Sequence, residues 1–332
     1  MLNTRRAGCR ALVVLVVLMA AIIMAGWAAA QTAKFPTKSS VTFIVATRPG
    51  GGTDTFVRLA APYLRNYLPE RPNIIVKNMP GAEHAIGINA CLRAKPDGHT
   101  LVTMLFPGDV LNEVLGLAKF DLSELAYLGT MTQVPNVLCV SAKRSERSLQ
   151  DLQEASKRKP LICSTPGLAT PAGAGSVIAS QVLGIESEFV PNVGGAQAVL
   201  AVLRGDCDYI ASSYTSFKSA VDNKQLIPIW IYSDKRFGHL PDVPTIVELG
   251  YPELVVPLQL YYGAAVSKKL PREILTIVRD AFRKTVEDPG YAKAMEKVGA
   301  YAVYTSPEDM EKVVDSAKRI YTKNKGLLEK YR

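Results

Sequence analysis

The sequence predicts an α/β protein with two lobes, each a mainly parallel sheet flanked by helices. Short apolar, β-rich runs alternate with helical patterns along most of the chain, which is the order of a parallel sheet with crossover helices. This β-α series begins after Val41 and again after Leu161. Loops rich in glycine or hydroxyl groups follow strands of both series, at the edge where such sheets bind ligands.

The first thirty residues are not expected to belong to the fold. Three arginines within the first ten residues precede an apolar run, residues 11–27, and a small-residue site, residues 28–30. This pattern is typical of a secretory signal peptide cut after Ala30, which implies a periplasmic protein. An uncleaved membrane anchor is the alternative, because the apolar run nearly reaches spanning length.

The charge balance favours a small anionic partner. The formal net charge is +9, and removing the three arginines of the signal peptide leaves about +6. Basic residues are not interleaved with stacking aromatic residues in runs, so we expect no nucleic-acid partner.

The cysteines and histidines indicate no metal chemistry. The four cysteines beyond the signal peptide are Cys91, Cys139, Cys163 and Cys207. Export permits disulfides, and four cysteines allow three pairings. Cys139 and Cys163 lie in apolar strand-like runs, which favours buried free thiols. The three histidines lack ligand spacing, so we expect no metal and no cofactor.

The first strand leads through three glycines into a helix. The β-rich run from Val41 to Ala46 precedes Pro49-Gly50-Gly51-Gly52-Thr53-Asp54, and apolar residues then recur at helical spacing up to Tyr67. Glycines allow the backbone to approach a ligand closely, and the first N–H groups of a helix have no internal partner. This stretch therefore predicts an anion site. A tight turn without a ligand is the alternative.

Candidate ligand-binding residues of this loop are Arg48, Gly50, Gly51, Gly52, Thr53 and Asp54. The amides from Gly51 to Asp54 are expected to hold one carboxylate, and Arg48 to pair with it or to lie exposed at the rim. Thr53 or Asp54 can cap the helix. Asp54 is favoured as a cap, because its charge would repel a carboxylate. Neither the phosphate-loop nor the dinucleotide-binding pattern matches here.

The rest of the first lobe continues the β-α alternation. Strands are expected at Asn73–Lys77 and Thr100–Leu105, with a helix at Glu83–Arg93 between them. Pro107 and Gly108, directly after the third strand, are candidate site residues. Two further strands are expected at Leu125–Thr130 and Val134–Ser141. Pro62 is expected to bend or interrupt the first helix.

The second lobe repeats the arrangement. A strand at Leu161–Ser164 precedes a loop with the candidate hydroxyls of Ser164, Thr165 and Thr170. A second glycine loop supplies Gly194, Gly195 and Ala196 as an amide nest, and Ser213 lies near a later strand end. For each loop a purely structural turn is the alternative. The final third of the chain is mainly helical and is expected to pack on the first lobe.

Taken together, these motifs resemble the Bug family, the substrate-binding proteins of tripartite tricarboxylate transporters. The matching pieces are Pro49–Asp54, Lys95-Pro96-Asp97-Gly98, Val134–Leu138, Ser164–Gly167, Val190–Ala196 and Leu240–Thr245. The resemblance implies a periplasmic-binding-protein-like (venus-flytrap) fold. We expect domain 1 at 34–134 plus 234–332 and domain 2 at 135–233. It also implies a monomer that binds a small carboxylate, largely through loop amides and ordered waters, and delivers it to membrane transporter subunits.

Several residues depart from the family pattern and leave the ligand open. Arg48 stands where a small or apolar residue is usual, Asn192 where a tyrosine is usual, and Gly173 where a histidine is common. Ser212-Ser213 replaces a common Asp-Asn pair. Dicarboxylates, tricarboxylates, aromatic acids, amino acids and neutral vitamin-like molecules all remain candidates.

Two other classes of function stay open. A periplasmic sensor module would use the same site and dock on a signalling receptor instead of a transporter. An exported hydrolase would need a nucleophile beside a base, and no G-x-S-x-G motif occurs. We therefore expect a binding protein and no enzyme.

Overall fold

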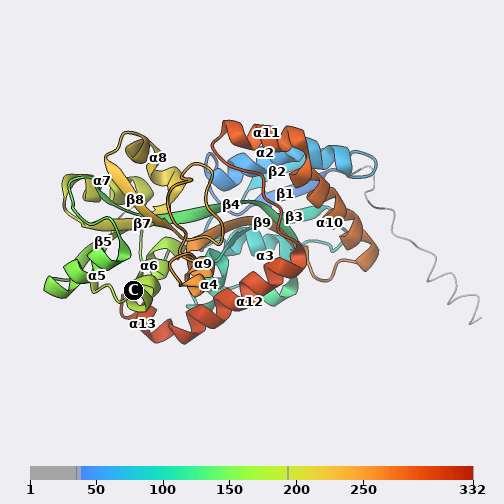
Figure 1. The fold of residues 1–332 in the computed structure, drawn as a ribbon. Helices are drawn as coiled ribbons and strands as arrows, with labels where there is room; N and C mark the ends of the chain where they lie inside the picture. Colours follow the sequence, from blue (N-terminus) through green and yellow to red (C-terminus); the bar gives the residue numbers. More distant parts are fainter. Residues whose placement is uncertain (1–34, 36–38, 193, 332) are drawn as a thin grey trace, which may run out of the picture.

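The computed structural model describes residue 35 and residues 39–192 and 194–331. The predicted signal peptide, residues 1–30, lies outside the described residues. Within them, a curled mixed sheet is flanked by helices (Figure 1). Strands follow one another in the order β2-β1-β3-β9-β4-β7-β5-β6, and β8 pairs with β4 beside this path. The α/β class predicted from the sequence is confirmed.

The first half of the sheet contains the predicted parallel strands and their crossover helices. They are β1 (Val41–Val45), α2 (Gly52–Tyr67), β2 (Ile74–Asn78), α3 (Ala85–Arg93), β3 (Thr100–Phe106) and α4 (Gly108–Val114). Both β2 and β3 pair with β1 in parallel. The loops that follow these strands therefore lie at one edge of the sheet.

Helix α2 runs without interruption from Gly52 to Tyr67 although it contains Pro62. The prediction that Pro62 could interrupt this helix is wrong. Pro62 is on the exposed side of the helix, where water can bond the carbonyl that loses its N–H partner. The opposite face, with Val57, Ala60 and Leu64, is buried and holds the helix in place.

The second half repeats the arrangement with its own parallel strands. Its elements are α5 (Leu149–Arg158), β5 (Leu161–Thr165), α6 (Pro171–Leu183), β6 (Ser187–Pro191), α7 (Gly195–Arg204), β7 (Tyr209–Ser213), α8 (Tyr214–Asp222) and β8 (Leu226–Ile231). Both β6 and β7 pair with β5 in parallel. The loops after these three strands share an edge as well.

One long strand, β4 (Leu125–Ser141), belongs to both halves (Figure 1). Its first part pairs with β9 (Gln259–Ser267), and its last part pairs with β7 and β8. The two strands predicted at Leu125–Thr130 and Val134–Ser141 are therefore one strand, and the predicted break is wrong. Pro135 lies opposite Gln259, the first residue of β9, so its missing N–H falls at the end of that ladder, where it costs little.

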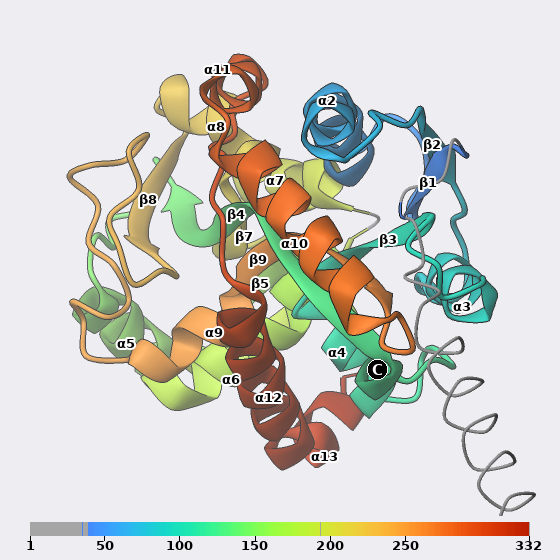
Figure 2. The ribbon, with the colours of Figure 1, turned by 90° about the vertical axis from the view of Figure 1, so that its right-hand side faces the viewer.

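The C-terminal third covers both halves. Its elements are the 3₁₀ helix η2 (Pro252–Leu254) and the helices α9 (Val255–Leu258), α10 (Arg272–Glu287), α11 (Pro289–Lys297), α12 (Pro307–Lys323) and α13 (Lys325–Glu329); a further 3₁₀ helix, η1 (Leu122–Glu124), precedes β4. As predicted, α10 and α11 pack on α2 of the first half (Figure 2). Helix α12 continues toward α9. The chain end reaches the second half, where the rings of Tyr331 and Phe189 lie 5.2 Å apart.

The apolar core joins the two halves. One cluster of buried side chains extends from Met104 and Phe106 of β3 to Tyr209 of β7 and Trp230 of β8. Separate clusters lie between α2 and α10 and beneath α7 and α8. Among the described residues, no helix combines the length and the apolar character needed to cross a membrane.

The four described cysteines are buried free thiols, as favoured from the sequence for Cys139 and Cys163. Burial raises the pKa of Cys91 and of Cys163 to about 12. Thiolates, the reactive form, are therefore scarce at neutral pH.

We expect Cys91, Cys139, Cys163 and Cys207 to resist iodoacetamide in the folded protein and to react fully in denaturant without a reductant. Intact mass before and after denaturation measures this. Labelling that requires a reductant would mean that a disulfide is present.

Candidate functional site

The direction of β4 makes the loop edges of the two halves face each other. Both β3 and β4 run antiparallel to β9, so β3 runs in the direction of β4, toward the second half. Strand β7 runs antiparallel to β4, so β7 and its parallel neighbours run back toward the first half. The carboxyl ends of both sets of parallel strands therefore converge on the middle of β4.

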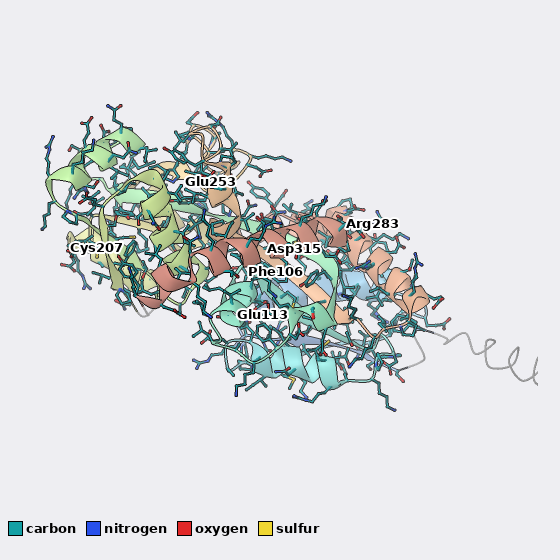
Figure 3. All side chains as sticks on the ribbon, turned by 90° about the horizontal axis from the view of Figure 1, so that it is seen from below. Phe106, Glu113, Cys207, Glu253, Arg283 and Asp315 are labelled. Atoms are coloured by element: carbon teal, nitrogen blue, oxygen red, sulfur yellow. The ribbon has the colours of Figure 1, made fainter. Side chains whose placement is uncertain are left out.

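The strand register gives the separation of the two edges. Phe106, the last residue of β3, lies opposite Tyr261, which lies opposite Gln133 of β4. Ser213, the last residue of β7, lies opposite Asn136. Three residues of β4 thus separate the two edges, which is roughly 10 Å along the strand. Phe106 accordingly lies near the middle of the molecule in Figure 3. We call Gln133–Asn136, together with the loops that converge on it, the central site.

The glycine loop of the first half is fixed from behind by Asp54. Its carboxylate accepts hydrogen bonds from the Gly50 N–H at 2.9 Å, from Arg58 Nε at 3.0 Å and from Asn78 Nδ2 at 2.9 Å. Asn78 Nδ2 also donates to the Thr47 carbonyl. The loop between β1 and α2 is therefore tied to the end of β2. Asp54 accepts the N–H of Gly50, which precedes the N-cap residue Gly51, so it supports the loop and does not make the side-chain cap favoured from the sequence.

The pKa of Asp54 is lowered to about 2. Burial acts in the opposite direction, but hydrogen bonds from Arg58, Gly50 and Asn78, with the charge of Arg58, outweigh it. Asp54 thus stays ionised and bonded to its supports, while Gly51 and Gly52 are exposed at the start of α2. The N–H groups of Gly52, Thr53 and Asp54 begin the helix and have no partner inside it.

Arg48 lies at the rim of this loop. Its residue is exposed, and no ion pair or hydrogen bond joins its side chain to the described part of the chain. It is free to meet an anion that approaches from solvent.

The loop after β3 brings the two halves into contact. The Phe106–Pro107 peptide bond is cis. A Cβ on Gly108 would lie 3.1 Å from Cγ of Pro171, at the start of α6. Pro107 and Gly108 therefore lie where the edge of the first half meets that of the second.

A histidine–carboxylate pair beside Gly108 was not expected from the sequence. His84 Nδ1 lies 2.7 Å from Oδ1 of Asp109, which is fully buried and also accepts the Leu105 N–H at 2.6 Å. Burial opposes a charged imidazole, but Asp109 outweighs it and raises the pKa of His84 above its usual value. The pair fastens the loop Ala82–His84, whose backbone is left-handed. These two residues are far apart in sequence, and only the shared edge of β2 and β3 could have suggested the contact.

In the second half, two of the hydroxyls predicted to bind the ligand form hydrogen bonds within the protein. Ser164 Oγ donates to the Ala198 carbonyl at 2.8 Å and accepts from Asn192 Nδ2 at 3.0 Å. Thr170 Oγ1 accepts the Gly173 N–H at 3.1 Å and donates to the Gly167 carbonyl at 2.6 Å, which caps α6. Both hydroxyls thus have structural bonds.

The second glycine loop opens α7 beside the start of α8. Gly194 has φ 87°, and it precedes Gly195, the first residue of the helix. A Cβ on Gly195 would lie 3.0 Å from Ser216 Oγ, which is 2.8 Å from Ser213 Oγ. Ala196 is exposed at the same end of α7. The four predicted residues Gly194, Gly195, Ala196 and Ser213 are therefore brought together.

Unpartnered buried polar atoms gather at the central site. In the described part of the chain, eight buried side-chain nitrogen or oxygen atoms have no hydrogen-bond partner. Five of them belong to Thr47 after β1, Thr132 and Asn136 of β4, and Thr165 at the end of β5. Such atoms are rare in folded proteins and call for an explanation. Asn136 and Thr132 were not predicted as site residues.

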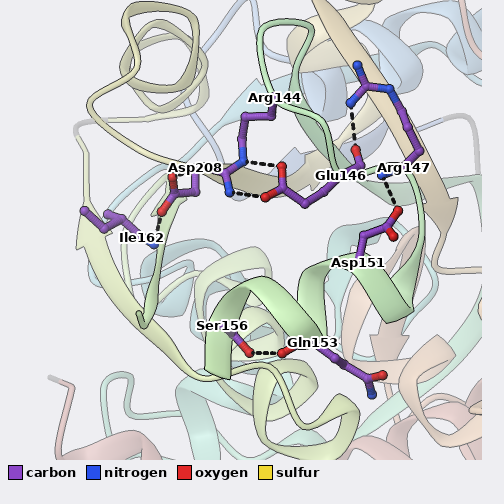
Figure 4. Close-up of polar contacts among 8 residues, drawn as sticks. All are labelled: Arg144, Glu146, Arg147, Asp151, Gln153, Ser156, Ile162 and Asp208. Atoms are coloured by element: carbon purple, nitrogen blue, oxygen red, sulfur yellow. Dashed lines mark hydrogen bonds and ion pairs between the residues drawn. The ribbon is translucent and has the colours of Figure 1, made fainter. Parts of the chain in front are cut away.

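Charged side chains of the second half gather at the opposite edge. Arg144 pairs with Glu146 and Asp208, and Asp208 accepts the Ile162 N–H near the beginning of β5 (Figure 4). Cavities of about 230 to 400 Å³ lie away from the glycine loops. One cavity of about 320 Å³ is lined by Gln133, Pro135 and Gln259. It lies on the face of β4 that is turned away from the Asn136 side chain.

Two sheet halves whose loop edges converge on a shared strand give the chain the fold of the periplasmic binding proteins. A family model described as "Tripartite tricarboxylate transporter family receptor" matches residues 57–330. The chain belongs to this family of solute-binding receptors, as the motifs of the sequence indicated.

Individual relatives are distant in sequence but similar over most of their length. Protein BugT of Bordetella pertussis is 25% identical over 295 residues, which cover 86% of this chain and 88% of BugT. A TctC solute-binding protein from Polaromonas has a TM-score of 0.79 at 24% identity, with 90% of this chain and 100% of that chain covered. MatC from Rhodopseudomonas palustris with bound malate has a TM-score of 0.65 at 20% identity, with 86% and 99% covered.

The bonds of Asp54 predict a pH-dependent contribution to stability. Because its pKa is lowered, the contribution is complete above about pH 4 and is lost as the pH falls toward 2. We expect Asp54→Asn to lose about 1–2 kcal/mol at neutral pH, a figure discounted because Arg58 is half exposed.

Thermal melts of both proteins between pH 2.5 and 7 measure this difference. Asp280→Asn, which changes an exposed carboxylate with exposed partners, is the matched control and should differ little from the unchanged protein. A deficit of Asp54→Asn that persists unchanged at pH 2.5 would contradict the assignment.

Proposed function

We propose that this receptor holds one small carboxylate at the central site and delivers it to the membrane subunits of a tripartite tricarboxylate-type transporter. The observation that carries the proposal is the convergence of two loop edges on Gln133–Asn136, with unpartnered buried polar atoms between them. Free helix-start amides point an excess of donors at this place, which suits an anion.

We assign binding to the backbone more than to charged side chains. The amides of Gly51, Gly52 and Thr53 hold the carboxylate from the first half, and those of Gly194, Gly195 and Ala196 face it from the second. Gly50, Pro107 and Gly108 shape the backbone around it, and Thr165 and Ser213 add hydroxyls. Asp54, Ser164 and Thr170 support the loops through their own bonds.

Entry of the ligand requires the two edges to separate. Gly108 lies close to Pro171, and the core cluster that joins the halves includes side chains of α9 and α12. We propose that the halves open at the loop edges and pivot about β4, with a domain division at residues 134/135 and 233/234. The bound malate named for MatC supports the carboxylate class of ligand, although the likeness itself is one of fold.

We also propose that the protein acts as a periplasmic monomer, after cleavage of its signal peptide behind Ala30. A sensor module would bind the same ligand, and capture of the transporter subunits from membranes separates the two functions. Turnover of the bound acid would identify an enzyme instead.

We expect Gly51→Asp to abolish carboxylate binding. Like charges in contact cost several kcal/mol, and about 1.4 kcal/mol corresponds to tenfold, so the affinity should fall by more than roughly 100-fold. Titration calorimetry with the acid that co-purifies from the periplasm, identified by native mass spectrometry, measures the loss.

Gly51→Ala is the control for bulk. Among the described residues, a Cβ at this position would have the Arg48 carbonyl as its one neighbour, at 3.9 Å, so this variant should bind as the unchanged protein does. Unchanged affinity in Gly51→Asp would refute the site.

Arg48→Ala should weaken binding modestly. An exposed arginine is screened by solvent and salt, so we expect a loss below about 1 kcal/mol at low salt that disappears at high salt. Calorimetry at two ionic strengths measures it. A loss greater than tenfold at both ionic strengths would instead indicate that Arg48 forms a buried pair with the ligand.

A further inference from the structure

Asn136 is the polar side chain whose environment is least explained by the fold. It is fully buried, and neither its Oδ1 nor its Nδ2 atom has a hydrogen-bond partner among the residues that the structure describes. A buried amide without partners is destabilising. Its backbone, by contrast, is bonded, because the Asn136 carbonyl accepts the Tyr232 N–H at 2.9 Å.

The side chain of Asn136 lies on the face of β4 that packs toward α2 in the first half and toward α6 in the second. Helix α7 packs on the other face of the strand, with Val137 and Cys139. Gln133 and Pro135 line the cavity on the other face, and side chains alternate along a strand. Asn136 therefore shares a face with Thr132. Thr132 lies opposite Tyr262, whose ring is 5.1 Å from that of Phe56 in α2. On the other side of Asn136, Leu138 packs in one cluster with Ala174 of α6.

The charges around this face suit a single carboxylate. Arg58 is engaged by Asp54, and His84 by Asp109. Within the described residues, the side chain of Arg48 forms no ion pair and no hydrogen bond. The loops of the second half contribute the neutral groups of Thr165, Asn192 and Ser213. A second carboxylate at Asn136 would face Oδ1, which is an acceptor and cannot pair with it.

We propose that the receptor selects a carboxylate that also carries a neutral group able both to donate and to accept hydrogen bonds, a carboxamide or a hydroxyl, which pairs with Asn136. A primary amide presents one acceptor and two donors, so a carboxamide satisfies it from both sides. A carboxylate only accepts and leaves Oδ1 unpaired. This inference rests on the proposed function, because the first carboxylate binds at the glycine loops.

Matched acids test the selection. Dicarboxylates of three to six carbons and their monoamides have the same number of heavy atoms and differ only at one end. In calorimetry, we expect the best monoamide to bind at least tenfold more tightly than its dicarboxylate. In Asn136→Leu, which keeps the volume but has no polar atoms, this ratio should fall below threefold.

A second measurement reports on Asn136 without any ligand. Because its amide is unpartnered, Asn136→Leu should leave the melting temperature unchanged or raise it. Asn192→Leu is the matched control, since Asn192 Nδ2 is bonded to Ser164 Oγ and to two carbonyls. That variant should melt at a lower temperature.

The possible outcomes distinguish a failure of this inference from a failure of the proposed carboxylate binding. Dicarboxylates that bind as tightly as the monoamides, or a preference that survives in Asn136→Leu, would overturn the inference and leave carboxylate binding intact. A lower melting temperature for Asn136→Leu, comparable with that of Asn192→Leu, would also overturn it. If none of the acids binds the unchanged protein, the carboxylate function falls and the inference with it.

Discussion

The shared strand β4 is the constraint on which the site depends. A strand that leaves one half of a sheet and enters the other fixes the direction of every strand paired with it. Because β3 runs with β4 and β7 runs against it, the two loop edges must face each other. If β4 had ended near Thr130, as the break predicted in the sequence implied, nothing in the register would align Phe106 with Ser213 across a distance of a few residues.

The same geometry explains why the centre of the molecule carries polar atoms that the fold does not satisfy. Two edges of helix starts and strand ends bring together N–H donors that have no carbonyl partner inside their helices. Side chains such as Asp54 and Ser164 are used to brace the loops from behind, which leaves the front of each loop free. In the proposed site, the binding surface is therefore mainly backbone, and side chains such as Asp54 and Ser164 hold it in place.

Features that depend on neighbouring residues could be predicted from the sequence, and features that depend on contacts between distant residues could not. The strand–glycine–helix pattern at Gly50–Asp54 is local, so the turn from β1 into α2 could be predicted from it, and the anion site that it suggests stays a prediction. The bracing bonds of Ser164 depend on Ala198 and Asn192, and the pair of His84 with Asp109 depends on two neighbouring strand ends. The spacing of apolar residues along the chain does not indicate such long-range contacts. The break predicted between Thr130 and Val134 failed for a similar reason, because the pairing that carries β4 through this stretch depends on β9, which lies far away in the sequence.

Asn136 shows what a buried polar residue can mean in a binding protein. In an ordinary core, an unsatisfied amide would be a defect of roughly 1–3 kcal/mol, and a leucine would serve the fold better. A receptor gains from retaining it, because the same unpaired atoms discriminate between ligands of equal size once the halves close. A site that was built to pair a hydrogen-bonding group rejects an analogue that lacks it far more strongly than an apolar pocket can distinguish shape. The cost to the unliganded fold and the selectivity of the liganded one are then two consequences of the same unpartnered amide.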